Sequence, residues 1–240
     1  MCIVRYLGSQ KATGGSVSTA GSYTVHTFTS AGTFTATQQI QATSLGFMQN
    51  KLTVTGATWG NDYGGSWYFD GSTYYISAGA ITGITDFTVE IWFKSDSVSN
   101  YRNPIDCNWL VYNGSYSNIG PRLEQNSSGN LVWTFGDTSG NYEGRTVVSS
   151  GLNASVPHCA VLTKVGSTYT SYYNGLAVQS GVASYTWPGY FNNIQIGRGF
   201  STSSERWFQG RIGSVKLYNK GLSSDEVFQN FTALRGRFGI

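Results

Sequence analysis

The sequence predicts an all-β protein, built as a two-sheet antiparallel sandwich. The 240 residues include 31 glycines, 16 tyrosines and 7 tryptophans. This composition suits short strands joined by tight turns, because glycine adopts turn conformations and aromatic residues favour pleated sheets. From Gly56 onward, strand-like runs recur at roughly 8–12-residue intervals with turn residues between them. Good helix formers are scarce until the C-terminal end.

Residues 1–56 are predicted to form an extended arm. Tyr23–Phe28 and Thr33–Thr37 read as strands with a short connection, which predicts a hairpin. An isolated hairpin is marginal in water, so the arm is expected to pack on the main domain, a neighbouring subunit or another protein, and a partner is favoured. The expected assembly contacts are Tyr23, His26, Phe28 and Phe34.

Residues 57–240 are predicted to form the sandwich, and the run Phe87–Phe93 gives its clearest strand. Side chains alternate between the two faces of a strand. The residues expected to face the core are Phe87, Val89, Ile91 and Phe93, and those expected on the other face are Thr88, Glu90 and Trp92.

Two turns and one helix complete this prediction. Asp70-Gly71 and Asn174-Gly175 are both typical of tight hairpin turns. Ser223 followed by Glu226 predicts a capping box at the start of a final helix. The apolar side of that helix is expected from Val227, Phe228 and Phe231.

Charge and cysteine content exclude several classes of protein. The net charge of +3 is too small to predict nucleic-acid binding. The residues from Arg198 to the C-terminus carry a local basic excess, which either faces an acidic partner or is simply solvated. Cys2, Cys107 and Cys159 form neither an even set nor a close pair, so free thiols are expected, two of them buried.

The N-terminus does not resemble a secretion signal, and there is no apolar run of the length that spans a membrane. Synthesis in a reducing cytoplasm without membrane association is therefore expected.

Three stretches resemble laminin-G-like, concanavalin-A-like jelly-roll domains: Gly65–Gly71 with Asp86–Lys94, then Tyr172–Gly175, then Gln209–Val227. They occur in the order found in that family. The resemblance implies two antiparallel sheets in jelly-roll order over residues 57–240, ending in a short helix and tail. One departure is Pro157-His158-Cys159, where the family often has Trp-His.

Two shorter stretches resemble proteins of tailed bacteriophages. Gln229–Gly239 is similar to the tails of such domains in virion proteins, and Tyr23–Phe28 with Gly32–Thr35 resembles a Gly-rich segment of tail-fibre and virion proteins. This resemblance implies a virion structural protein that decorates or cements a capsid as a homo-oligomer in contact with other capsid or tail proteins. The alternatives are a tail-fibre or adhesin subunit that binds host glycans, and a free lectin-like module.

No catalytic constellation is found. Glucanases of this architecture place two carboxylates on one strand, whereas Glu90 stands alone on its strand. His158 and Cys159 are adjacent, so on a strand their side chains face opposite ways. The sequence therefore predicts a protein that is not an enzyme.

Calcium is the only cofactor considered. Related jelly rolls often hold this ion with oxygen ligands. The resemblance offers Asp70 as a ligand, and the alternative is a turn aspartate that bonds its own backbone.

Two aromatic loops are candidate glycan or partner contacts. The first contains Trp59 and Tyr63, and the second contains Trp187, Tyr190 and Asn192. Aromatic rings with amides suit sugar binding, protein interfaces and plain packing at the core edge alike.

Overall fold

The computed structural model describes residues 2–7, 12–21, 23–29, 35–36, 52–98, 101–107, 111–112, 115–116, 120–126, 128–139, 141–191, 193–201 and 204–240. The chain forms two compact units, Met1–Thr43 and Ser44–Ile240. The boundary lies earlier than the expected one after residue 56, because Thr53–Thr55 (β6) pairs with a strand of the second unit.

The N-terminal unit contains a three-stranded antiparallel sheet in the order β1 (Cys2–Leu7), β4 (Tyr23–Phe28) and β3 (Ser16–Ala20). A second pair joins β2 (Ala12–Thr13) to β5 (Thr35–Ala36). The predicted hairpin between Tyr23–Phe28 and Thr33–Thr37 is therefore wrong. The chain turns instead just before Tyr23, where Gly21 has a φ of +60° that suits a two-residue hairpin turn.

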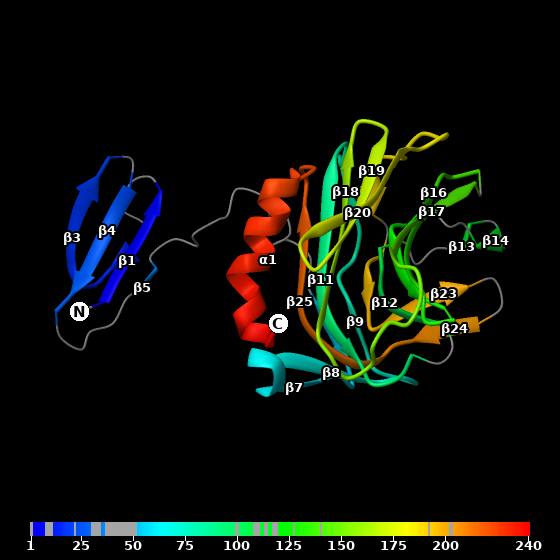
Figure 1. The fold of residues 1–240 in the computed structure, drawn as a ribbon, viewed down its shortest axis with the longest axis horizontal. Helices are drawn as coiled ribbons and strands as arrows, with labels where there is room; N and C mark the ends of the chain where they lie inside the picture. Colours follow the sequence, from blue (N-terminus) through cyan, green and yellow to red (C-terminus); the bar gives the residue numbers. More distant parts are fainter. Residues whose placement is uncertain are drawn as a thin grey trace. The chain divides into compact units, whose positions relative to one another are not determined.

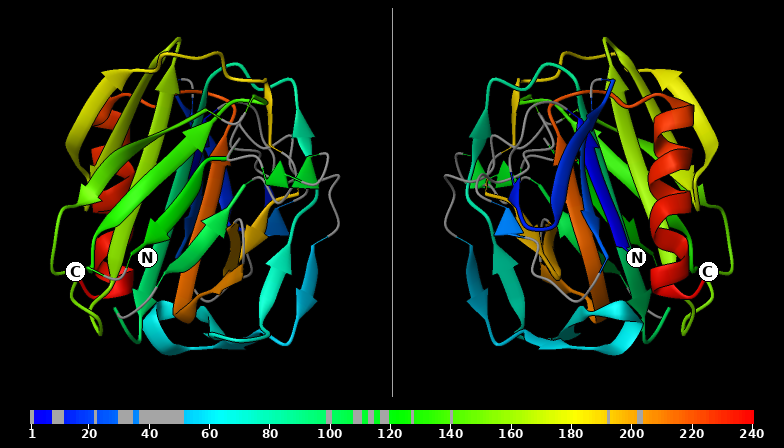
Figure 2. Two further views of the ribbon diagram at one scale, coloured as in Figure 1. Left: turned by 90° about the vertical axis from the view of Figure 1, so that its right-hand side faces the viewer. Right: turned by 90° about the vertical axis from the view of Figure 1, so that its left-hand side faces the viewer.

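The second unit is a sandwich of two seven-stranded antiparallel sheets (Figures 1 and 2). The helix-side sheet contains, in spatial order, β20 (Leu176–Val182), β19 (Thr168–Tyr173), β18 (His158–Val165), β11 (Phe87–Ser95), β25 (Gln209–Tyr218), β8 (Ser66–Asp70) and β7 (Thr58–Gly60). The distal sheet contains β17 (Tyr142–Val148), β16 (Leu131–Gly136), β15 (Arg122–Gln125), β12 (Arg102–Asp106), β22 (Gln195–Ile196), β9 (Tyr75–Ser77) and β6.

Shorter elements lie in the connections. They are the pairs β10 (Ile81–Thr82) with β21 (Tyr190–Phe191), β13 (Val111–Tyr112) with β14 (Ser115–Tyr116), and β23 (Arg198–Ser201) with β24 (Ser204–Trp207), and the 3-10 turn η1 (Asp62–Gly64). One α-helix, α1 (Ser224–Phe238), follows the last strand.

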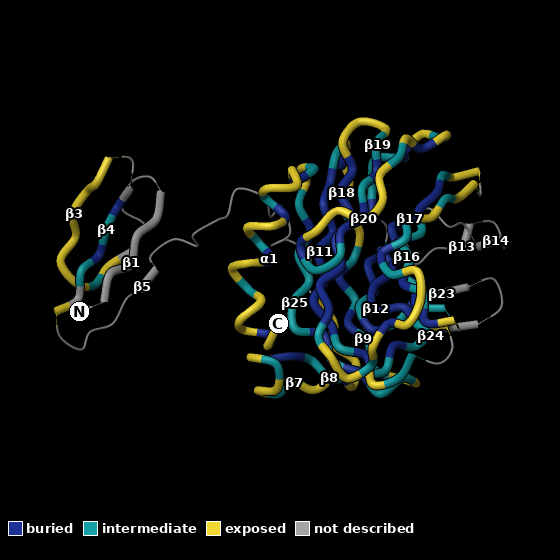
Figure 3. Tube along the Cα trace, viewed as in Figure 1, coloured by how far each residue is buried: buried dark blue, intermediate teal, exposed yellow. Residues whose placement is uncertain are grey.

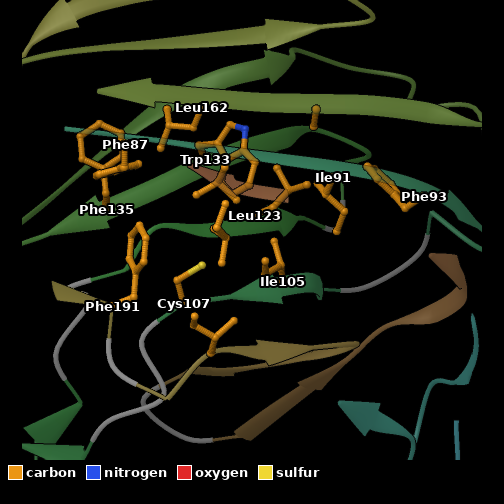
Figure 4. Close-up of a cluster of buried hydrophobic side chains, with 14 of the residues drawn as sticks. Phe87, Ile91, Phe93, Ile105, Cys107, Leu123, Trp133, Phe135, Leu162 and Phe191 are labelled. Carbon is orange, nitrogen blue, oxygen red and sulfur yellow. The ribbon is translucent and has the colours of Figure 1, made fainter. Parts of the chain in front are cut away.

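The main core lies between the two sheets (Figure 4). The four side chains of β11 that were predicted to face inward all belong to it, together with Trp133 and Phe135 of β16. The alternation on β11 is confirmed. Trp92 and Glu90, on the opposite face, are also buried, because α1 covers that face.

Helix α1 packs on the outer face of the helix-side sheet through a second apolar cluster. Phe231 stacks on Trp92 with ring centroids 5.5 Å apart, and Phe238 stacks on the same indole at 4.7 Å. Figure 3 shows the buried and exposed sides of the helix. Val227 is buried as predicted, whereas Phe228 lies on the exposed side.

The capping box is confirmed. The Ser223 hydroxyl accepts from the backbone of Glu226, and the Glu226 carboxylate accepts from the backbone of Ser223. The two groups satisfy backbone N–H groups at the start of the helix, which have no partner within it.

The Asn174-Gly175 turn is confirmed as a hairpin between β19 and β20, with φ positive at both residues. The Asp70-Gly71 turn does not make a hairpin. It carries the chain from β8 in the helix-side sheet to β9 in the distal sheet. Because β8 and β9 belong to different sheets and do not pair, the Asp-Gly dipeptide alone could not predict this crossing.

Cys107 and Cys159 are buried free thiols, as expected. Among the described residues, no helix has the length and apolar character needed to cross a membrane.

Candidate functional site

A pocket opens beside the turn between β18 and β19. Figure 1 shows this turn at one end of the sandwich. We call this hollow the end pocket; its volume is about 250 Å³. Three segments line it: Ile84 and Thr85 before β11, residues around the β18–β19 turn, and the connection that leads to β21. The lining residues are Ile84, Thr85, Lys164, Gly166, Ser167, Tyr169, Tyr185, Thr186, Trp187 and Gly189.

The pocket has buried aromatic walls and a polar rim. Trp187 is only 9% exposed, and its indole N–H donates to the carbonyl oxygen of Ile84 at 2.8 Å. Tyr169 stacks on Phe135 with ring centroids 3.9 Å apart. The rim carries three exposed hydroxyl-bearing residues, Thr85, Ser167 and Thr186. A ligand would therefore meet rings and hydroxyl groups together.

The hydroxyl of Tyr169 has no hydrogen-bond partner among the described residues, although the residue is 1% exposed. Burial, followed by the nearby Tyr185 and Glu143, raises the pKa of Tyr169, so the group is a neutral phenol at physiological pH. An unpartnered buried hydroxyl costs about 1–3 kcal/mol. A polar group that entered the pocket and reached it would recover part of that cost.

Lys164 adds a buried ammonium to the pocket. Its Nζ donates to the carbonyl oxygen of Thr85 at 2.6 Å and lies 3.5 Å from Oδ1 of Asp86. Asp86 also accepts from the backbone N–H of Gly166 at 2.9 Å, which fixes the β18–β19 turn. The positive charge is therefore balanced locally, and the pocket does not select for an anion.

Tyr185 lines both the end pocket and a second hollow, the side groove. The side groove has a volume of about 530 Å³ and is lined by Asn141, Tyr142, Ser184 and Tyr185. The Tyr185 hydroxyl donates to the carbonyl oxygen of Phe135 at 2.6 Å, so the ring is held in place.

Glu143 joins the segment carrying Tyr185 to the distal sheet. Its Oε1 accepts from the backbone N–H of Ser184 at 3.0 Å and from the Ser184 hydroxyl at 2.7 Å, while Oε2 accepts from Arg145. These hydrogen bonds, those from Ser184 first, lower the pKa of Glu143. The carboxylate is fully engaged and positions the wall of the pocket.

Residues 69–228 match a family described as the concanavalin A-like lectin/glucanases superfamily, Laminin_G_3. The chain belongs to this family. A comparison with curated proteins found no match. The family assignment confirms the lectin-like jelly-roll sandwich expected from the sequence.

Solved structures share this fold at low sequence identity. The binding domain of botulinum neurotoxin serotype G has 12% identity and a TM-score of 0.59, with alignment over 77% of this chain and 46% of that one. The serotype D/C binding domain has 12% identity and a TM-score of 0.60, with 77% and 47% covered. A structure of botulinum neurotoxin type C, whose cell entry is described as dependent on interaction with two ganglioside molecules, has 14% identity and a TM-score of 0.60, with 77% and 46% covered. We call the second unit, Ser44–Ile240, the lectin-like domain. The alignment thus spans less than half the length of these neurotoxin chains.

The second predicted aromatic loop contributes to the end pocket, although differently from expectation. Trp187 is a buried wall residue rather than an exposed ring. Tyr190 is partly buried and pairs with Thr82 through β21 and β10. Asn192 lies outside the described residues.

The first predicted loop lies at the other end of the sandwich. Trp59 is 52% exposed and packs edge-on against Trp67 at 5.5 Å. Tyr63 is partly buried, with the ammonium of Lys94 4.5 Å from its ring centroid. Lys164 of the end pocket pairs with Phe87 at the first end of β11. Trp59 lies beside Trp67 of β8, which is aligned through β25 with Phe93 near the last end of β11. The two predicted loops therefore do not form one site.

Asp70 does not fit a calcium site. Its two carboxylate oxygens accept from the backbone of Ser72, Thr73 and Tyr74 and from the hydroxyls of Ser72 and Thr73. Burial is the largest single influence and raises the pKa of Asp70, but the hydrogen bonds together outweigh burial and lower the pKa. Nearby Asp62 is paired with Arg211 at 2.7 Å. Within the described ranges, no three His, Cys, Asp or Glu side chains gather as metal ligands.

His26, predicted as an assembly contact, is buried inside the N-terminal unit. Its Nδ1 donates to the carbonyl oxygen of Gly14 at 2.8 Å. The side chains of Tyr23 and Phe28, and the whole of Phe34, lie outside what the structure describes.

Sequence reasoning did not single out Tyr169 and Lys164 as site residues. Tyr169 and Lys164 read as ordinary strand residues, because their alternation matches the core pattern. No sequence signal reports that the Tyr169 hydroxyl lacks a partner, since its neighbours come from three separate segments.

Proposed function

We propose that the lectin-like domain is a non-enzymatic binding domain that takes a carbohydrate in the end pocket. The observation that carries the proposal is a pocket lined by Tyr169, Tyr185 and Trp187, in which the buried hydroxyl of Tyr169 has no hydrogen-bond partner among the described residues. The C–H face of a sugar ring packs against aromatic side chains, and its hydroxyl groups pair with buried polar groups.

The balance of charge in the pocket favours a neutral sugar. Lys164 is already neutralised by Asp86, and its remaining donor capacity suits a hydroxyl oxygen. The ganglioside interaction named for the type C neurotoxin supports carbohydrate recognition by proteins that contain this fold. That likeness covers less than half of the neurotoxin chain and transfers no residue.

The test is a glycan array probed with the full chain, followed by titration calorimetry with the best neutral saccharide. Tyr169→Phe removes only the hydroxyl. It is expected to weaken binding about 2- to 12-fold, as the loss of one hydrogen bond to a neutral partner would do. The same variant is expected to be as stable as wild type or slightly more stable, because it removes an unpaired polar group from the interior.

Two results would count against the carbohydrate proposal. One is silence of the whole array. The other is binding that Tyr169→Phe leaves unchanged.

We further propose a virion structural role, as a second candidate. It is supported by the separate N-terminal unit, which offers an attachment module distinct from the lectin-like domain, and by the resemblance of Gln229–Gly239 to the tails of phage virion proteins. In this role the chain is a homo-oligomer in the virion that contacts other capsid or tail proteins, either as capsid decoration or as an adhesin subunit.

Co-sedimentation with phage heads and tails tests this role. The full chain is expected to pellet with one of them. A variant lacking residues 2–43 is expected to stay in solution while its tryptophan fluorescence remains that of a folded lectin-like domain. Pelleting of the truncated variant would contradict attachment through the N-terminal unit.

A further inference from the structure

The end pocket and the side groove meet at a single side chain, Tyr185. The end pocket, at about 250 Å³, is below the range of about 300–1,000 Å³ that is typical of pockets for drug-sized ligands. It therefore has room for one small ring. The side groove, of about 530 Å³, is also lined by Tyr185.

The side groove carries an exposed ring of its own. Tyr142 is 63% exposed, at the first residue of β17, which is the edge strand of the distal sheet. Its neighbours in the groove are polar: the amide of Asn141 and the hydroxyl of Ser184. The Ser184 hydroxyl donates to Glu143, so its oxygen is free to accept a hydrogen bond from a ligand.

Tyr185 is rigid enough to serve as a shared wall. Its own hydroxyl is bound to Phe135, and Glu143 holds the preceding residue through both the backbone and the side chain of Ser184. A ligand that occupies both hollows must therefore cross Tyr185 without displacing it. A chain of sugar rings joined by glycosidic bonds has this form.

We propose that the domain binds a neutral oligosaccharide of at least two sugar units, one in the end pocket and the next in the side groove against Tyr142. This inference rests on the proposed carbohydrate function and adds the length of the ligand and a second contact residue. Tyr169 belongs to the first subsite, and Tyr142 belongs to the second.

The experiment compares short and long ligands on the full chain. Methyl glycosides of glucose, galactose and mannose, and the corresponding di- and trisaccharides, are titrated by calorimetry against wild type, Tyr142→Ala and Tyr169→Phe. Wild type is expected to bind a disaccharide at least about tenfold more tightly than the matching methyl glycoside. Tyr142→Ala is expected to remove about 3- to 10-fold of disaccharide affinity and to leave the methyl glycoside unchanged.

Trp59→Ala is the matched control, because Trp59 is a similarly exposed aromatic residue at the other end of the sandwich. It is expected to change neither affinity. Equal affinity of wild type for mono- and disaccharide, or equal weakening of both by Tyr142→Ala, would overturn the two-subsite proposal while leaving the end pocket as a sugar site. Failure of every saccharide to bind would overturn the proposed function itself.

Discussion

The change Glu90→Gln tests how helix α1 is held on the sandwich. Glu90 is 1% exposed on the outer face of β11. Its Oε1 accepts from the indole N–H of Trp92 at 2.9 Å and from Nζ of Lys216 at 2.8 Å. Its Oε2 accepts from the amide of Asn230 at 3.1 Å, and Asn230 belongs to α1. The carboxylate therefore joins two strands and the helix.

The expected loss follows from the number of acceptors. Glutamine replaces one acceptor oxygen by an amino group, so at least one of the three donors loses its partner. A hydrogen bond to a charged group contributes about 1.5–3 kcal/mol. The side chain of Lys216 is 31% exposed and regains water, which limits the cost of losing the ion pair. We expect the free energy of unfolding to fall by about 2–3 kcal/mol, or roughly 4–12 °C in Tm for a domain of this size.

Urea unfolding followed by tryptophan fluorescence measures this loss. All seven tryptophans lie between Trp59 and Trp207, so the signal reports the lectin-like domain alone. Glu226→Gln is the control, because Glu226 pairs with Lys220 at the exposed start of α1 and glutamine also completes a capping box. Its expected cost is small, because the ion pair of Glu226 is exposed to solvent. Equal effects of the two substitutions would refute a buried network that holds the helix.

Three further predictions concern stability. His158 donates to the carbonyl of Asn153 and accepts from Tyr173, and burial lowers its pKa. Below the unfolded pKa of about 6.5 only the unfolded chain gains a proton, so the free energy of unfolding of wild type should fall by up to about 1.4 kcal/mol more than that of His158→Gln between pH 7.5 and 5.5. Equal pH slopes of the two proteins in urea unfolding would contradict this. Gly175→Ala should lower the free energy of unfolding by about 2 kcal/mol, since φ is +83° and a Cβ would lie 2.8 Å from Phe231. Gly151→Ala, at a φ of +68° in open space, should cost less, and equal Tm values of the two variants would refute the contact with Phe231. Asp70→Ala should lower the free energy of unfolding by about 2 kcal/mol at neutral pH, and this difference should shrink as acid protonates the carboxylate of wild type. Added calcium should leave the Tm of wild type unchanged, and a rise in Tm would restore the calcium hypothesis.

The parts of the fold that the sequence predicted are those governed by local or periodic rules. The alternation of Phe87–Phe93 follows from the two faces of a strand, and the Ser223–Glu226 capping box and the Asn174-Gly175 turn each need only a few neighbouring residues. The hairpin predicted between Tyr23–Phe28 and Thr33–Thr37 failed because β4 pairs with β3 across the turn at Gly21 and with β1 on its other side.

The site was less predictable than the fold. The aromatic composition of the loop around Trp187 suited a glycan contact, a partner contact or plain packing, and composition does not state which ring is buried. Asp70 matched a ligand position and instead satisfies the backbone of its own turn. The defining feature is the Tyr169 hydroxyl, which has no hydrogen-bond partner within the described part of the chain. It arises from the packing of segments that are distant in the sequence, so no local pattern reports it.

The most direct test of the account is a crystal structure of the full chain soaked with the neutral oligosaccharide that the glycan array selects. The account predicts a sugar ring in the end pocket, with a hydroxyl within hydrogen-bond distance of Tyr169 and the next ring across Tyr185. A saccharide bound elsewhere on the domain, for example against Trp59, with the end pocket filled only by solvent, would contradict it.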